Sequence, residues 1–128
     1  MAPSVPAGAE KGVEGGVHFD VSIDEHAEEY SVLAVRGEVD LHTAPKVQYA
    51  IERAAGNGAN AVVVDMSGVE FMDSTALSTF MHAKDYLGKR NISLRLAAPS
   101  QAVERIFTVT GIRDYFDIFA SREDAVSG

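Results

Sequence analysis

The sequence predicts a single α/β domain, a mixed β-sheet with helices packed against it, in the order β-β-α-β-α-β-α-β-α. Residues 17–23 alternate apolar and polar side chains at the period of a half-buried strand, and a second strand is expected at 30–36 after a polar turn. The later apolar segments alternate between helical spacing and short strand-like runs. Strands that alternate with helices are typical of β-α-β crossovers, which connect parallel strands.

The first two strands are expected to form an antiparallel hairpin that ends at Gly37, and a helix follows. Thr43 is the candidate N-cap, and Pro45 fits the first turn, where an N–H group has no intrahelical partner. Apolar residues at helical spacing mark one face of this helix, namely Val47, Ala50, Ile51 and Ala54. The sequence Gly56-Asn57-Gly58 is expected to end it.

The nearly continuous apolar run 61–66 predicts a central strand that is buried on both faces of the sheet. Ser67-Gly68 is expected to turn the chain after it. A helix is expected at 74–87, with its stop at Gly88, and a strand at 92–97. The next helix is expected to begin at Ser100 and to end at Gly111, and its inner face carries Val103, Ile106, Phe107 and Thr110. A strand at 115–119 and a short final helix follow, with Ser121 and Asp124 as the capping box of that helix.

The composition argues against several classes of function. The chain has 128 residues, 46% of them hydrophobic, which suits one compact domain with its own core. Its net charge of −8 would repel nucleic acid and would steer a basic surface of a protein partner towards it. There are no cysteines, the four histidines lack metal-ligand spacing, and no apolar run reaches the ~20 residues of a membrane span. We therefore expect a cytoplasmic protein without cofactor, metal, nucleic acid or membrane partner.

Residues 1–16 are rich in Ala, Gly, Pro and Glu and show no periodicity, so we expect a disordered tail there and a folded domain at 17–128. A monomer is expected. An open sheet edge is the place where a dimer could form.

The segment from Phe71 to Ser78 sets two hydroxyl groups beside one carboxylate where a strand gives way to a helix. A phosphate at such a turn changes charge, helix capping and surface shape together. Ser74 and Thr75 are therefore candidate phosphorylation sites of a switch. Ser74 or Asp73 is also a candidate N-cap, and the two roles are compatible.

A catalytic role is disfavoured. Ser74 could act as a nucleophile with His82 as its base, but no Gly-x-Ser-x-Gly elbow surrounds the serine. His82 lies two turns further along the expected helix, about 12 Å away. The chain also lacks a phosphate-binding P-loop and a dinucleotide-binding glycine motif. We therefore do not expect an enzyme.

Two segments resemble the signature stretches of STAS domains, most closely those of bacterial anti-sigma factor antagonists: Gly37-Glu38-Val39-Asp40-Leu41-His42-Thr43-Ala44-Pro45 and Phe71-Met72-Asp73-Ser74-Thr75-Ala76-Leu77. A third segment, 102–112, is similar to that family's third helix and its end. The resemblance covers residues 17–126 and implies a STAS-like fold. The chain departs from the family at Ala76, where the family usually has Gly, and at Ser78, where it often does, and glycine would let a partner backbone approach more closely.

The resemblance implies a partner-switching function. The unphosphorylated protein would bind an anti-sigma factor that is also a serine kinase and so release a sigma factor, and a PP2C-type phosphatase would reverse the phosphorylation. The modified hydroxyl would be Ser74 or Thr75, with Ser74 favoured because relatives with a Ser-Thr pair tend to use the serine. The expected partner-binding residues are Asp40, Asp73, Ser78, Thr79 and His82. A stand-alone STAS accessory or scaffold subunit of a signalling or transport complex is the alternative function.

Overall fold

The computed structural model describes residues 18–56 and 58–128. The expected disordered tail at 1–16, and Asn57 of the expected helix stop, lie outside the described residues. The elements are β1 (Phe19–His26), β2 (Tyr30–Val39), α2 (Ala44–Ala55), β3 (Ala61–Met72), α3 (Ser74–Gly88), β4 (Ser93–Ala97), α4 (Gln101–Thr110), the 3-10 turn η2 (Arg113–Tyr115), β5 (Asp117–Phe119) and α5 (Arg122–Ser127). The predicted order of strands and helices is confirmed.

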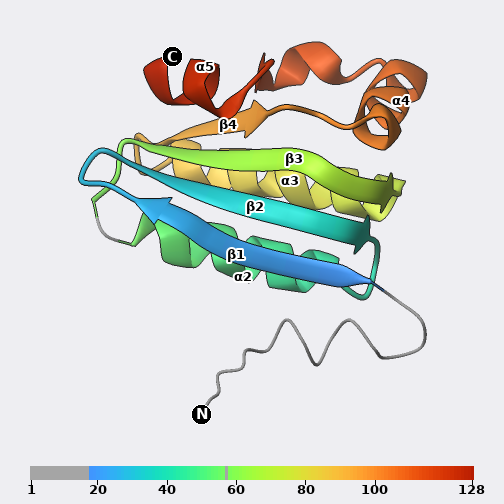
Figure 1. Cartoon of the computed structure of the whole chain (residues 1–128), viewed down its shortest axis with the longest axis horizontal. Coiled ribbons are helices and arrows are strands. Elements are labelled where there is room, and N and C mark those ends of the chain that lie inside the picture. The colour runs from blue at the N-terminus through green and yellow to red at the C-terminus, as the bar shows by residue number, and fades with distance from the viewer. Residues whose placement is uncertain (1–17, 57) are drawn as a thin grey trace.

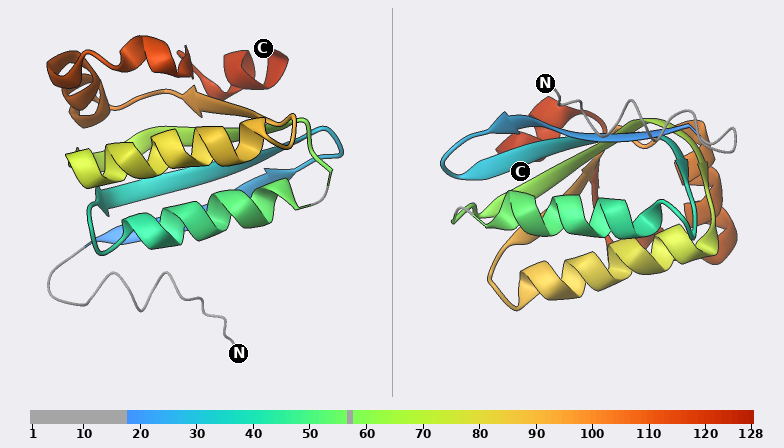
Figure 2. Two further views of the ribbon diagram at one scale, coloured as in Figure 1. Left: turned by 180° about the vertical axis from the view of Figure 1, so that it is seen from behind. Right: turned by 90° about the horizontal axis from the view of Figure 1, so that it is seen from below.

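The five strands form one sheet in the order β1-β2-β3-β4-β5, as Figure 1 shows. β1 and β2 are antiparallel, as the hairpin pattern predicts, and every other neighbouring pair is parallel. Because the strand order follows the chain without reversal, right-handed crossovers bring the connecting helices to one face of the sheet. Figure 2 shows α2 and α3 side by side on that face.

The main core lies between the sheet and the helices. Alternate residues of β2 and β3, such as Leu33 and Val64, point into it, and Val103 and Phe107 extend it to α4. A smaller cluster on the opposite face holds Val32, Val63 and Ala97 under Ala125 of α5. β3 is therefore buried on both faces where the run 61–66 predicts it.

The predicted turn at Ser67-Gly68 is wrong, because β3 continues without a break to Met72. Gly68 is paired with Arg36 of β2. A Cβ atom at Gly68 would lie 2.9 Å from the Arg36 Cγ atom, so this glycine provides room for a neighbouring side chain rather than a turn. β2 likewise runs past the expected stop at Gly37, to Val39.

Gly37 forms part of an irregular stretch of the β2–β3 ladder. The register shifts between Ala34 and Arg36 and again between Gly37 and Glu38. Gly37 has φ +90°, and a Cβ atom there would lie 2.1 Å from the backbone oxygen of His18. Only glycine fits this position, and the irregularity sets the direction in which β2 enters the following loop.

Three smaller expectations at the ends of elements are corrected. α3 includes Gly88, and the left-handed residue beyond it is Asn91, with φ 60°. Thr110 is exposed rather than on the inner face of α4. The last strand begins at Asp117, because η2 occupies the residues before Phe116. The left-handed stop at Gly111 is confirmed, as are the helix starts at Ser100 and Ser121, where each serine hydroxyl accepts a backbone N–H three residues ahead.

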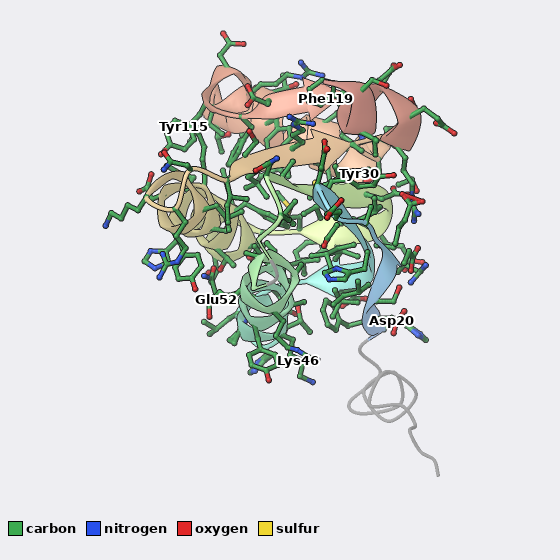
Figure 3. All side chains as sticks on the ribbon, turned by 90° about the vertical axis from the view of Figure 1, so that its left-hand side faces the viewer. Asp20, Tyr30, Lys46, Glu52, Tyr115 and Phe119 are labelled. Atoms are coloured by element: carbon green, nitrogen blue, oxygen red, sulfur yellow. The ribbon has the colours of Figure 1, made fainter. Side chains whose placement is uncertain are left out.

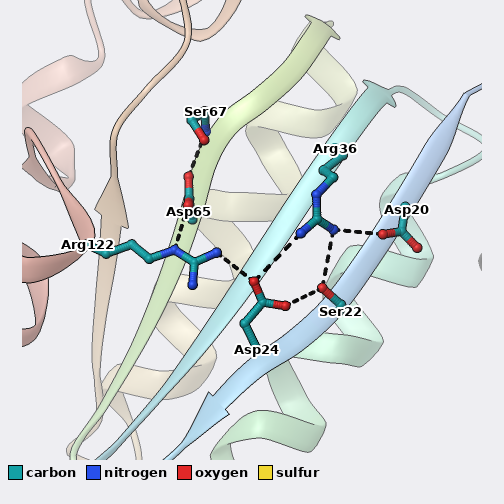
Figure 4. Close-up of polar contacts among 7 residues, drawn as sticks. All are labelled: Asp20, Ser22, Asp24, Arg36, Asp65, Ser67 and Arg122. Atoms are coloured by element: carbon teal, nitrogen blue, oxygen red, sulfur yellow. Dashed lines mark hydrogen bonds and ion pairs between the residues drawn. The ribbon is translucent and has the colours of Figure 1, made fainter.

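The face of the sheet opposite α2 and α3 carries a polar network (Figure 4). Arg122, the first residue of α5, donates from Nε to Asp65 of β3 and from Nη2 to Asp24 of β1, each at 2.6 Å. The backbone N–H of Ser67 donates to the other oxygen of Asp65 at 2.8 Å. One arginine thus links α5 to two strands, and Arg95 holds the other end of α5 by donating to the carbonyl of Ala125 at 2.9 Å.

Arg36 extends the network to the hairpin edge. Its Nη1 atom donates to Asp20 at 2.8 Å, and its Nη2 atom lies 3.7 Å from Asp24. Ser22 donates to Asp24 at 2.5 Å. Asp24 therefore lies between two guanidinium groups, and the two arginines together bind three carboxylates of this face.

Substituting Gly37→Ala is expected to lower the free energy of unfolding by more than about 3 kcal/mol, since a methyl group would add a backbone clash to left-handed strain. Gly111→Ala is the matched control. Gly111 has φ +70° but no atom within 4 Å of the new Cβ position, so its cost should be about 1–2 kcal/mol. Urea unfolding measures both variants, and equal losses would contradict the steric role of Gly37.

Substituting Arg122→Gln is expected to make the free energy of unfolding less dependent on pH in the acidic range. Burial raises the pKa of Asp65, but hydrogen bonds from Ser67 and Arg122 outweigh it and hold that pKa below its ordinary value. The pKa of Asp24 is lowered in the same way, by Ser22 and Arg122 against burial. A carboxyl with a depressed pKa stabilises the fold above the unfolded value of about 4, and this contribution is lost as pH falls through the folded pKa.

The variant should therefore be less stable by about 1 kcal/mol at pH 7, a value reduced for partial exposure, and the difference should shrink below about pH 4. Urea unfolding at a series of pH values measures it. Arg105→Gln is the control, because Arg105 is exposed and forms no ion pair with any described residue. A difference that stays constant from pH 7 to pH 2 would count against the ion pairs.

Candidate functional site

The two signature segments meet where the C-terminal ends of β2 and β3 form one edge of the sheet. β2 and β3 are parallel, and their last residues, Val39 and Met72, are paired. The backbone N–H of Asp73 continues this ladder by donating to the carbonyl of Val39 at 3.3 Å. The loop after β2 and the start of α3 are therefore neighbours, so that Asp40 and Ser74 emerge at the same edge.

The loop between β2 and α2 is held by hydrogen bonds between its own residues. Asp40 accepts the backbone N–H groups of His42 and Thr43 at 2.9 and 3.2 Å. The Thr43 hydroxyl donates to the Glu38 carbonyl and accepts from the Asp40 N–H, each at 2.9 Å. Thr43 thus occupies the predicted N-cap position without capping the helix through its side chain, while Pro45 lies in the first turn as predicted.

At the start of α3, Asp73 is the residue that caps. Its backbone is extended, and its carboxylate accepts the N–H of Ala76 at 2.9 Å. Ser74 is the first residue of the helix and is exposed. Within residues 18–56 and 58–128, its hydroxyl has no hydrogen-bond partner. The alternative of Ser74 as the cap is therefore excluded.

Thr75 differs from Ser74 in its surroundings. It is half-buried, and its carbonyl accepts the hydroxyl of Thr79 at 3.2 Å. Thr75 also lines a groove between α2 and α3, whereas Ser74 does not. The two adjacent hydroxyls therefore face different environments, one open to solvent and one at the wall of a groove.

The groove has a volume of about 410 Å³. Three of the predicted partner-binding residues, Ser78, Thr79 and His82, lie along its α3 side together with Thr75. Its α2 side is formed by Leu41, Ala44, Pro45 and Gln48. Asp40 and Asp73 do not line the groove and lie in the two loops at the sheet edge, so the predicted set divides into a loop group and a groove group.

The sequence analysis missed two exposed apolar side chains near the site. Leu41 is 65% exposed in the loop after β2, and Phe71 is 49% exposed two residues before Asp73. Exposed apolar side chains are common singly, and those that a partner covers act as the anchors of an interface. The sequence carried one signal for them. Leu41 and Phe71 are apolar residues inside the two signature segments, at positions where no helix or strand pattern requires an apolar side chain.

The start of α3 is suited to an added negative charge. The first turn of α3 contains no acidic residue. Unpaired N–H groups and the helix dipole stabilise an anion at such a position. The only nearby carboxylate of the motif is Asp73, and that carboxylate already accepts a backbone N–H.

The described residues at this site can be examined for a metal centre and for the Ser74–His82 pair. Within the described part of the chain, no group of three or more His, Cys, Asp or Glu side chains is placed to hold a metal ion. His82 lies in the groove, and no hydrogen bond joins it to Ser74 among the described residues. In the same part of the chain, none of the helices has the length and apolar character needed to cross a membrane.

The STAS domain family model matches residues 20–125, which includes both signature segments and every described helix and strand except the ends. The chain belongs to the STAS domain family. This assignment confirms the resemblance seen in the sequence and the STAS-like fold that it implied.

Curated and solved STAS proteins agree with this assignment. The anti-sigma-B factor antagonist of Listeria monocytogenes serovar 1/2a is 32% identical over 102 residues, which cover 80% of this chain and 90% of that protein. The structure of an anti-sigma factor antagonist from Mycobacterium paratuberculosis superposes with a TM-score of 0.73 at 29% identity, covering 85% of this chain and 92% of that one.

A third relative has been solved in two chemical states. The Bacillus anti-sigma factor antagonist SpoIIAA superposes with a TM-score of 0.70 in its unphosphorylated form and 0.64 in its phosphorylated form, both at 20% identity and over 84% of this chain. The alignments cover 94% and 97% of those chains. At this identity the likeness concerns the fold, and the STAS fold therefore exists with and without a phosphate.

Substituting Asp73→Ala is expected to lower the free energy of unfolding by about 1 kcal/mol, because the N-terminal N–H groups of α3 lose their side-chain acceptor. Ser74→Ala should change it by less than about 0.5 kcal/mol, because the hydroxyl is exposed and unbonded. Urea unfolding distinguishes the two variants. A larger loss for Ser74→Ala than for Asp73→Ala would show that the cap has been assigned to the wrong residue.

Proposed function

We propose that this STAS protein is an anti-sigma factor antagonist. In the unphosphorylated form it binds an anti-sigma factor with serine kinase activity and so releases a sigma factor, and phosphorylation ends the binding. The relatives named as anti-sigma factor antagonists support this function, since one of them aligns over 90% of its own length. The observation that carries the proposal is the exposed, unbonded hydroxyl of Ser74 at the first residue of α3.

Ser74 is the proposed phosphorylation site, in preference to Thr75. A kinase must reach the hydroxyl with its catalytic groups and a bound nucleotide, which requires an accessible acceptor. Ser74 is exposed, whereas Thr75 is half-buried at the groove wall. Because Asp73 supplies the helix cap, modification of Ser74 removes no hydrogen bond that holds α3 in place.

Phosphorylation would end binding through charge. The phosphate adds about −1.5 to −2 charges beside Asp73 on a chain that already carries −8. An interface fitted to a neutral hydroxyl must then desolvate this charge, which costs several kcal/mol when no partner group pairs with it. A shift from mostly bound to mostly free requires about 5.5 kcal/mol of differential affinity. One poorly paired phosphate supplies much of that difference.

The protein's own fold would survive the modification. A phosphate at the first residue of α3 faces the unpaired N–H groups and the positive end of the helix dipole. The STAS fold of SpoIIAA in both its unphosphorylated and its phosphorylated form is consistent with this tolerance. The switch would therefore act at the interface, without refolding of the antagonist.

The proposed partner surface has two parts around Ser74. Asp40 and Asp73 form the loop part, and the groove residues Ser78, Thr79 and His82 form the helix part. The exposed apolar side chains of Leu41 and Phe71 are the proposed anchors, because buried apolar anchors dominate the energy of most interfaces. We further assign the protein to the cytoplasm, as a monomer in the free state, with a PP2C-type phosphatase that restores the unmodified form.

A kinase assay tests the proposal. The purified chain is incubated with ATP, Mg²⁺ and, one at a time, each anti-sigma factor kinase encoded in its source genome, and its intact mass is measured. One kinase should add a single phosphate to the wild-type chain and to Thr75→Val, but none to Ser74→Ala. Binding of that kinase, measured by calorimetry, should weaken at least about a hundredfold for Ser74→Asp and for the phosphorylated chain.

The thermal midpoint of Ser74→Asp is the control, and it should stay close to that of the wild type because the N-terminus of α3 tolerates an anion. The proposal is wrong if the phosphorylated chain binds its kinase as tightly as the unmodified chain does. Phosphate on Thr75→Val but also on Ser74→Ala would move the modification site away from Ser74.

A further inference from the structure

The outer face of α2 is basic, although the chain as a whole is acidic, with a net charge of −8. Lys46, Tyr49 and Arg53 follow one another at steps of three and four residues, which places them on one face of the helix. All three are exposed. These three residues form what we call the α2 strip, which has two cations and one aromatic ring.

The cations of the α2 strip are not neutralised by the rest of the structure. Within residues 18–56 and 58–128, neither Lys46 nor Arg53 forms an ion pair. Glu52, the acidic residue of α2, is half-buried and accepts a hydrogen bond from Gln48 at 2.7 Å. Figure 3 looks along α2 and shows Glu52 on the side nearer to α3, with Lys46 on the far side. The strip therefore differs from the reverse face of the sheet, where two arginines bind carboxylates.

The stability of α2 accounts for only part of the strip. The Arg53 guanidinium lies 5.8 Å from the centre of the Tyr49 ring, and a cation in the last turn complements the negative end of the helix dipole. Lys46 has no such role, because it lies in the first turn, where the dipole favours an acidic residue. Tyr49 remains 63% exposed despite its contact with Arg53. A cation at the unfavourable end of the helix and an uncovered ring call for another reason.

We propose that the α2 strip binds an acidic segment of the anti-sigma factor and thereby helps to determine which anti-sigma factor the protein recognises. This inference rests on the proposed function and extends it to the chemistry of the partner. Carboxylates are the electrostatic complement of the two cations, and tyrosine and arginine are enriched at the energetic centres of interfaces. The strip also adjoins the proposed partner surface, because Pro45, next to Lys46, lines the α2–α3 groove.

The two sides of the proposed interface then carry opposite charge. Asp40 and Asp73 lie in the loops at the sheet edge, and Lys46 and Arg53 lie along α2. A partner that fits both sides presents a basic region to the loops and an acidic region to the helix. A rotated or shifted partner would bring like charges together, which costs affinity. This charge pattern therefore fixes the orientation of the partner and rejects proteins with a different pattern.

A protein segment fits the strip better than other anions do. Nucleic acids and anionic membranes also attract cations, but they present negative charge over a large area. The rest of this chain is acidic and repels such a surface. An acidic protein segment can confine its negative charge to the area of the strip.

Charge reversal tests the strip in the complex. Lys46→Glu and Arg53→Glu should each weaken the affinity for the kinase identified by the mass assay at least about tenfold in about 50 mM NaCl, as measured by calorimetry. Arg105→Glu is the matched control, because it changes the net charge equally at an exposed position of α4, and its effect should stay below about twofold. Equal losses in all three variants would show that only net charge matters and would overturn the proposal.

Salt dependence separates charge from shape. The losses caused by Lys46→Glu and Arg53→Glu should shrink to less than about threefold in about 500 mM NaCl, because salt screens exposed charges. Tyr49→Ala should weaken the affinity about tenfold at both salt concentrations, because it removes an apolar contact. Losses from charge reversal that are equally large at both concentrations would contradict an electrostatic role of the strip.

Lys46→Glu also separates binding from folding. The substitution places an acidic residue in the first turn of α2, where the dipole favours it, so the thermal midpoint of the free variant should stay equal or rise while its affinity falls. A purely structural role of Lys46 predicts the reverse, a lower midpoint with unchanged affinity.

An acidic peptide tests the strip without the kinase. NMR titration of the full ¹⁵N-labelled chain with hexaglutamate should shift the backbone amide signals of residues 46–53 more than those of residues 101–110. The double variant Lys46→Glu/Arg53→Glu should lose these shifts. Absence of shifts at 46–53, or equal shifts in both ranges, overturns the assignment of the strip. Shifts at 46–53 that a DNA duplex causes and hexaglutamate does not would assign the strip to nucleic acid and overturn the choice of a protein partner.

The outcomes distinguish the two proposals. If no kinase binds the wild-type chain, the proposed function fails, and the hexaglutamate titration alone decides whether the strip receives acidic groups. If a kinase binds the wild type and both charge-reversal variants equally well, the proposed function stands and the role of the α2 strip is wrong.

Discussion

The parallel pairing of β2 with β3 is the constraint on which the site depends. This ladder continues through the irregular stretch at Gly37 to the pair Val39–Met72, and the Asp73 N–H extends it by one more bond. The two loops that it brings together are more than thirty residues apart in the chain. A Cβ atom at position 37 would collide with the backbone oxygen of His18, just before β1, and would change the direction of β2. The geometry of the proposed switch is thus set inside the sheet, at a distance from the Ser74 hydroxyl.

The division of labour between Asp73 and Ser74 follows from this geometry. Asp73 satisfies the helix start, so the adjacent serine has no structural duty among the described residues. A hydroxyl that also served as the cap would be less available, and its modification would disturb the helix that presents it. Because Asp73 caps the helix, the proposed phosphorylation of Ser74 would change the charge at one position while α3 keeps its cap. The same logic separates exposed Ser74 from half-buried Thr75.

Much of this could be predicted from the sequence, because the relevant forces are local. Strand periodicity, the caps at Ser100 and Ser121 and the left-handed stop at Gly111 depend on neighbours along the chain, and all are found. The prediction of a turn at Ser67-Gly68 was wrong because Gly68 makes room for the side chain of Arg36 on another strand, and no local pattern reveals such a contact. The hydroxyls and carboxylates of the site were recognisable as a motif. The exposure of Leu41 and Phe71 was not, since no local pattern shows which apolar side chains the packed fold leaves uncovered.

The uninterrupted strand order has a further consequence for evolution. The residues proposed to recognise the partner come from the α2–α3 side and its loops, whereas the Arg36–Asp24–Arg122 network occupies the reverse side of the sheet. The two sets share no residue. Substitutions on the proposed partner surface can therefore change what such a protein recognises while the same framework folds unchanged. A single architecture can in this way serve several partners that do not compete for one another's binding surface.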